Sequence, residues 1–120
     1  MGIAKAFDFI HATNHVLVEL YASASEDKMH IQYLLSANCF GNHYVRTGLD
    51  LATRELITLS ILVSLGGCEA QVKGHVAANL HVGNDRARLI DVLTQLLPFI
   101  GYPRTLNALR VLNESTAGAQ

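Results

Sequence analysis

Apolar residues recur at helical spacing along almost the whole chain, and no stretch shows the sustained apolar–polar alternation of a strand. The spacing predicts helices over about residues 5–22, 27–40, 53–65, 68–82, 86–97 and 103–113. Glycine, proline, asparagine or serine residues separate these segments from one another. The pattern therefore predicts an all-α fold of about six helices, in one domain that spans all 120 residues.

The segment 53–65 is apolar on nearly every side, which predicts a helix that is buried all round. This apolar run is too short to cross a bilayer, so no membrane segment is predicted. Gly66 and Gly67 separate it from the next predicted helix. Its sequence is the least interrupted apolar stretch in the chain, and we expect the other helices to pack around it.

The helix predicted over residues 68–82 carries most of the candidate chemistry. At 100° per residue, one narrow stripe of this helix contains Cys68, Gln71, His75 and Asn79. Val72, Val76 and Leu80 form the neighbouring apolar stripe. A thiol, an imidazole and two amides on one side of a packed helix form either a seam of satisfied hydrogen bonds or a functional site. The spacing leaves both interpretations open.

The composition bears on partners and location. Hydrophobic residues make up 50% of the chain and charged residues only 16%, whereas soluble domains carry about 25% charged residues. So few charges on a small chain predict that partner subunits cover much of its surface. The net charge is -1 and there is no basic run, which argues against nucleic acid as a partner. The first fifteen residues lack the apolar core of a signal peptide, so a cytoplasmic location is expected.

The cysteines and histidines do not predict a metal site. Cys39 and Cys68 are the two cysteines, and they form neither a CxxC motif nor a zinc-type spacing. His11 and His15 are four residues apart on a predicted helix, but the pattern favours two partly exposed histidines over metal ligands. No metal and no other cofactor are therefore predicted.

Several short motifs occur in a characteristic order: Gly48-Leu49-Asp50, Arg54-Glu55-Leu56, Leu65-Gly66-Gly67, Gln71 to His75, Val82-Gly83-Asn84 and Pro98 to Pro103. Together they resemble the carboxymuconolactone decarboxylase family, whose members share the alkylhydroperoxidase D-like fold. The resemblance covers about residues 40–114 and leaves residues 1–39 as an N-terminal helical extension. It implies an all-α homo-oligomer, commonly a trimer or a hexamer.

The redox branch of that family has a Cys-x-x-Cys-x-x-x-His pattern with an upstream glutamate. Cys68 matches the first cysteine, His75 the histidine and, approximately, Glu55 the glutamate, whereas Gln71 replaces the second cysteine. The match implies a thiol-dependent peroxidase or related oxidoreductase. In that interpretation the N-terminus of the helix stabilises the thiolate form of Cys68. His75 accepts the proton of the Cys68 thiol, and Glu55 orients His75.

The decarboxylase branch implies acid–base chemistry on a small lactone or carboxylic acid. Here His75 is the proton donor, because an imidazole can donate and accept protons near neutral pH. Gln71 and Asn79 would hydrogen-bond the substrate, and Arg54 would pair with its carboxylate unless Arg54 instead forms a salt bridge with Glu55 or Asp50.

The predicted catalytic residues are thus Cys68, His75 and Glu55, and the predicted substrate-binding residues are Gln71, Asn79 and Arg54. A thiol-dependent peroxidase is the first hypothesis and a His75-dependent decarboxylase or other acid–base enzyme the second. A non-catalytic oligomer with a degenerate site is the third, because Gln71 stands where the redox branch has its second cysteine and where the decarboxylase branch often has a glutamate. Burial separates these hypotheses, since a functional His75 should be reachable by solvent.

Overall fold

The computed structural model of the chain describes residues 29–118, and it divides the chain into two compact units, Met1–Leu51 and Ala52–Gln120. The described part of the first unit contains helix α2 (Met29–Leu34) and a π-helical segment, η2 (Leu35–His43). Together they match the helix predicted over residues 27–40. The helix predicted over residues 5–22, with His11 and His15, lies outside the described residues.

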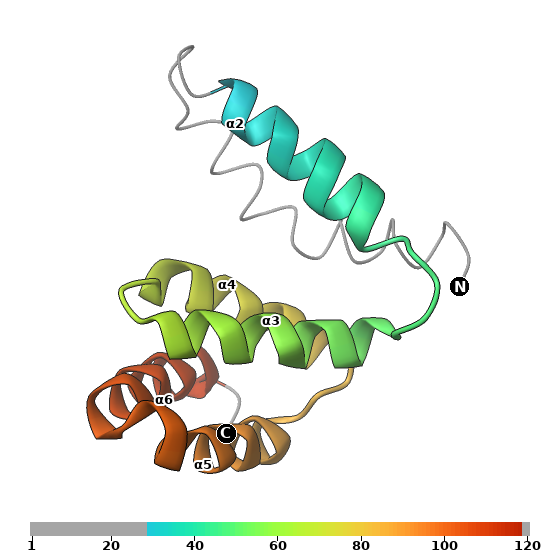
Figure 1. Cartoon of the computed structure of the whole chain (residues 1–120). Coiled ribbons are helices and arrows are strands. Elements are labelled where there is room, and N and C mark those ends of the chain that lie inside the picture. Colours follow the sequence, from blue (N-terminus) through green and yellow to red (C-terminus); the bar gives the residue numbers. More distant parts are fainter. Residues whose placement is uncertain (1–28, 119–120) are drawn as a thin grey trace. The chain divides into compact units, whose positions relative to one another are not determined.

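The second unit contains four helices of similar length (Figure 1). They are α3 (Leu51–Leu65), α4 (Glu69–His81), α5 (Arg86–Ile100) and α6 (Tyr102–Thr116). Residues 29–118 contain no strand, so the all-α prediction is confirmed over this range. None of the helices described here is both long enough and apolar enough to cross a membrane.

The core of the second unit draws side chains from all four helices. Its buried members are Leu59, Val63, Val72, Val76, Leu89, Leu93, Ala108, Val111 and Leu112. Helix α6 packs against α4 and against α5. Buried side chains of α3 and α4 complete the cluster. This packing places α3 beside α4, the two helices that carry most of the predicted site residues.

The turn between α3 and α4 depends on two glycines. Gly66 and Gly67 have φ values of +72° and +71°, a backbone region that residues with a Cβ rarely adopt. A Cβ at residue 66 would also lie 2.9 Å from Nε of Arg104, which reaches over the turn from α6. The Gly66-Gly67 pair therefore allows both the reversal of the chain and the close approach of Arg104.

Two helix predictions need correction. Helix α5 does not end before Pro98 but continues to Ile100, and Gly101, with φ of +82°, ends it. Pro98 is exposed, so the carbonyl that lacks its usual N–H donor can be hydrated. Helix α3 is not buried all round in the single chain, because Ile57, Ile61 and Leu65 are exposed.

Candidate active site

His75 on α4 and Glu55 on α3 form a hydrogen-bonded pair. Nδ1 of His75 lies 2.7 Å from Oε2 of Glu55. The Glu55 side chain has no exposed surface, whereas the His75 side chain is 23% exposed. An ionised carboxylate only accepts hydrogen bonds, so Nδ1 of a neutral imidazole donates and Nε2 keeps its lone pair. The structure thus holds one histidine ring in a defined orientation with part of the ring open to solvent.

The two partners meet because α3 and α4 run back along each other from the glycine turn (Figure 1). Glu55 lies about three helical turns before the turn and His75 about two turns after it. Glu55 also points to the same buried face of α3 as Leu59 and Val63. Burial of a carboxylate among apolar residues costs free energy, and the bond to His75 offsets part of that cost.

Asn79, which is predicted to bind substrate, lies in the interior between α3 and α4. It is fully buried, and its Nδ2 donates to the backbone carbonyls of both Glu55, at 3.1 Å, and His75, at 2.8 Å. Its Oδ1 accepts a hydrogen bond of 2.9 Å from Nδ2 of Asn84. With its polar atoms engaged and no surface exposed, Asn79 has a hydrogen-bonding role between the two helices in this structure.

Arg54 and Gln71 each precede one member of the pair in sequence, Arg54 directly before Glu55 and Gln71 four residues before His75. Gln71 is exposed one turn before His75 on α4, where an amide can reach a molecule that contacts the His75 ring. Arg54 precedes Glu55 on α3 and is half-buried. His81, at the end of α4, is exposed, as expected from its position outside the polar stripe.

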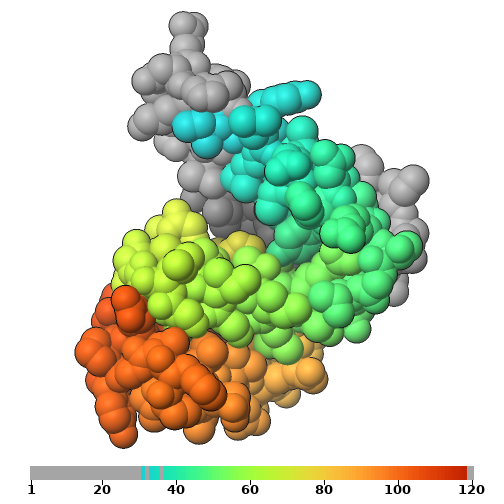
Figure 2. Space-filling model, viewed as in Figure 1, coloured from blue at the N-terminus to red at the C-terminus, as the bar shows by residue number. Residues whose placement is uncertain are grey.

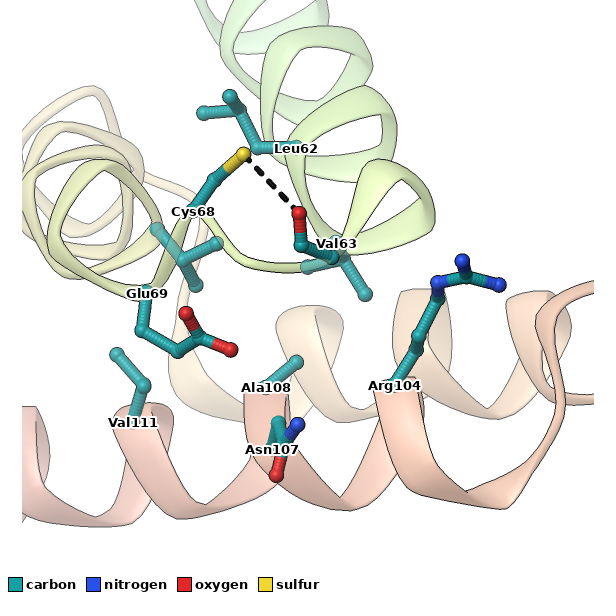
Figure 3. A pocket seen from close by; sticks show the side chains of 10 residues that line it. Leu62, Val63, Cys68, Glu69, Arg104, Asn107, Ala108 and Val111 are labelled. Carbon is teal, nitrogen blue, oxygen red and sulfur yellow. Dashed lines mark hydrogen bonds between the residues drawn. The ribbon is translucent and has the colours of Figure 1, made fainter.

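Cys68 is the N-cap residue of α4 and its thiol is not in a disulfide. The side chain is half-buried, and Sγ donates a weak hydrogen bond of 3.4 Å to the carbonyl of Gly66 (Figure 3). His75 is seven positions after Cys68, a rise of about 10 Å along the helix. A proton transfer between the thiol and the imidazole therefore needs an intervening water or substrate.

Cys68 lines a crevice between α3, α4 and α6, which we call the Cys68 crevice. Its polar lining consists of Cys68, Glu69, Arg104 and Asn107, and the remaining lining is mainly apolar (Figure 3). The side chains of Glu69, Arg104 and Asn107 make no hydrogen bond or ion pair with residues 29–118, and Arg104 and Asn107 are exposed. The enclosed part has room for about one water molecule, so only the end of a substrate can enter it.

The sequence-predicted catalytic residues are thus brought together only in part. Glu55 and His75 are in contact, whereas His75 does not line the Cys68 crevice. Sequence reasoning missed Asn84 and Arg104. Asn84 had a visible signal, since it ends the Val82-Gly83-Asn84 motif, but nothing in that motif indicates a contact with α3. The N-cap of α5 is Asp85, whose side chain accepts from the N–H of Arg88 at 2.8 Å.

The comparisons with known proteins place this chain in a family. The family model for the carboxymuconolactone decarboxylase family matches residues 30–114, which begins ten residues before the resemblance seen in the motifs. A comparison with curated proteins gives no match. The family match covers η2, α3, α4 and α5 completely, almost all of α2 and α6, and each of the predicted site residues. The chain therefore belongs to the carboxymuconolactone decarboxylase family.

Proposed function

We propose that this protein is an acid–base enzyme that moves a proton to or from a carbon atom of a small lactone or carboxylic acid. The single observation that carries this proposal is the His75–Glu55 pair. A solvent-reachable imidazole whose other nitrogen is held at 2.7 Å by a fully buried carboxylate is suited to general acid–base catalysis. The family match supports the class of substrate.

In a decarboxylation, the bond between the substrate carbon and its carboxylate breaks, and carbon dioxide leaves without the bonding electron pair. That pair remains on the substrate as an enolate, which takes a proton from Nε2 of the protonated His75. The imidazole then regains a proton from water, and the hydroxide left behind combines with the carbon dioxide to give bicarbonate. Glu55 stabilises the ring while it is protonated, because its charge is opposite, and it accepts from Nδ1 both before and after the transfer. Gln71 is placed to donate a hydrogen bond to the enolate oxygen.

A panel of small lactones and carboxylic acids incubated with the protein in deuterium oxide tests this proposal. We expect at least one compound to incorporate deuterium at carbon, with or without loss of carbon dioxide, as measured by mass spectrometry and proton NMR. Heat-denatured protein is the control for spontaneous exchange. If no member of the panel exchanges or decarboxylates, and peroxides are not reduced either, the non-catalytic alternative replaces both proposed activities.

The second candidate function is thiol-dependent reduction of a peroxide or another small electrophile. It is favoured by the reduced, half-buried thiol of Cys68 at the start of α4. The Cys68 thiolate would attack the peroxide, break the oxygen–oxygen bond and form a sulfenic acid and an alcohol. Since Gln71 replaces the second cysteine, a small-molecule thiol would then form a mixed disulfide with release of water. A second thiol molecule would release Cys68.

The electrostatic setting of Cys68 can be measured without a known substrate. Arg104 and Cys68 both lie close to Gly66, so the guanidinium should favour anionic reagents at the thiol. We expect Arg104→Gln to lower the ratio of alkylation rates for iodoacetate over iodoacetamide about threefold, because exposed charge pairs contribute up to about 1 kcal/mol. The measurement uses a Cys39→Ser background. Arg110→Gln, on the same helix, is the control and should leave the ratio unchanged, and an unchanged ratio in Arg104→Gln would contradict this role.

We also propose that the chain is a homo-oligomer. Ile57, Ile61 and Leu65 form an exposed apolar stripe along α3, with 43, 54 and 63% of each residue exposed. Figure 2 shows that part of α3 lies at the surface of the second unit. Exposed apolar stripes of this kind support association between subunits.

Sedimentation equilibrium should give at least a trimer, and Ile61→Lys should weaken the association. A monomer at micromolar concentration would contradict the proposal.

A further inference from the structure

Two buried amide side chains, Asn79 and Asn84, link the main-chain segments that carry Glu55 and His75. Asn79 has no exposed surface and Asn84 is 2% exposed. Nδ2 of Asn84 donates to Oδ1 of Asn79 and to the carbonyl of Ala52, both at 2.9 Å. Nδ2 of Asn79 in turn donates to the carbonyls of Glu55 and His75. Each amide nitrogen thus uses both of its N–H bonds.

These bonds allow only one orientation of each amide. If the Asn79 amide were rotated by half a turn, its oxygen would face the carbonyl oxygens of Glu55 and His75, and its nitrogen would face the nitrogen of Asn84. Neither arrangement forms a hydrogen bond, and an unsatisfied buried polar group is costly. Asn84, by donating to Oδ1, therefore acts together with the two carbonyls to fix which way Asn79 points.

The geometry matters for the site because a single nitrogen, Nδ2 of Asn79, bonds the main chain of both members of the pair. Glu55 and His75 belong to different helices, and a hydrogen bond to each carbonyl limits how far α3 and α4 can shift at this level. The side-chain contact of 2.7 Å between Nδ1 and Oε2 depends on that spacing. A shift of α4 by a fraction of an ångström would lengthen it.

Asn84 lies outside both helices. It follows Gly83, two residues before α5 begins, and its backbone N–H donates to the carbonyl of Asn79 at 3.0 Å. Its side chain reaches the carbonyl of Ala52 in the first turn of α3. The connection between α4 and α5 is thereby tied to the start of α3, close to Glu55 in sequence.

We propose that Asn84 is a positioning residue for His75, which acts through Asn79 and does not touch the substrate. The inference rests on the proposed function of His75 and adds a determinant of its geometry. Loss of the Asn84 donor leaves Oδ1 of the buried Asn79 amide without its hydrogen bond, and an acceptor at residue 84 favours the rotated amide, which lacks the shared bond to the Glu55 and His75 carbonyls. The imidazole then loses its defined orientation although Glu55 and His75 are both still present.

The test uses protein labelled with ¹⁵N-histidine and the variant Asn84→Asp. Aspartate has the same shape, but when ionised it turns an oxygen toward the Asn79 and Ala52 oxygens that the amide nitrogen of Asn84 contacts. Two-dimensional NMR at alkaline pH reports which ring nitrogen of His75 carries the proton, and His75→Gln identifies the signal among the six histidines. In the wild-type protein we expect a single tautomer with the proton on Nδ1.

In Asn84→Asp we expect the His75 ring to occupy both tautomers. We expect its Nδ1 proton to exchange with solvent about tenfold faster than in the wild type, which is the size of effect that the loss of one hydrogen bond produces. Asn113→Asp, an exposed position whose oxygen accepts from Arg86, is the matched control and should keep the wild-type spectrum. Asn84→Ser, which keeps one donor, is measured at a temperature where its circular dichroism is native and should show an intermediate exchange rate.

The outcomes separate this inference from the proposed function. Variants that melt at lower temperature but keep the wild-type His75 signal would show that Asn84 is only structural, and the positioning role would be wrong. A wild-type His75 without an Nδ1 proton would instead contradict the His75–Glu55 pair on which the proposed function depends. If Asn84→Asp does not fold, the Asn84→Ser spectrum decides between a positioning role and a merely structural role for Asn84.

Discussion

The variant His75→Gln is expected to lower turnover of the identified substrate at least about a hundredfold while leaving the fold intact. Removal of a general acid or base typically costs a factor of 10²–10⁴ in rate. Glutamine has no group that titrates near neutral pH, so it cannot exchange a proton with a carbon atom. Its amide N–H can still donate to Glu55, which keeps the buried carboxylate hydrogen-bonded.

The stability of His75→Gln therefore distinguishes a functional role from a structural one. Because the His75 side chain is 23% exposed, we expect the free energy of unfolding to change by less than about 1 kcal/mol. Urea denaturation followed by circular dichroism gives this value. His81→Gln, an exposed histidine at the end of the same helix, is the matched control and should retain activity. Full turnover by His75→Gln would refute the acid–base proposal.

The variant Glu55→Gln is expected to lower turnover while leaving the protein as stable as the wild type or more stable. Glutamine can place its oxygen where Oε2 lies, so it still accepts from Nδ1 of His75 and keeps the tautomer. It lacks the negative charge that stabilises the protonated imidazole. A hydrogen bond to a charged group contributes about 1.5–3 kcal/mol and a neutral one about 1 kcal/mol, so turnover should fall roughly tenfold.

The melting temperature of Glu55→Gln should stay the same or rise. Glu55 has no exposed surface, and a neutral side chain of the same size does not carry the desolvation cost of a buried carboxylate. Differential scanning calorimetry tests this, with Glu114→Gln as a control at an exposed carboxylate that pairs with Arg110. A large drop in melting temperature with unchanged turnover would show that Glu55 is retained for stability and not for catalysis.

Much of the helical structure followed from local patterns. Apolar spacing predicted the helices, and the Gly66-Gly67 and Gly83 positions predicted where α3 and α4 end, because such breaks depend on backbone preferences of single residues. Pro98 misled the prediction for α5. A proline in the exposed last turn of a helix leaves only one carbonyl without its donor, and water can supply that bond.

The candidate site was predictable only as a set of residues on one helical stripe. The stripe gave no reason to distinguish the environments of Cys68, Gln71, His75 and Asn79. The structure gives each of these side chains a different environment. Asn79 is fully buried and hydrogen-bonded, His75 is partly exposed beside a carboxylate, and Gln71 is exposed. Burial depends on which neighbouring helix covers each part of the stripe, and helical periodicity carries no information about that.

The sequence by itself determined the all-α class, most of the helix boundaries and the family, because these depend on local backbone preferences and on the order of short motifs. Only the tertiary structure decided that Glu55 meets His75, that Asn84 holds Asn79, and that Arg104 reaches the turn before Cys68. Each of these contacts joins residues from different helices or loops. Their distances are set by how the core side chains pack, which is a property of the folded chain and not of any one segment.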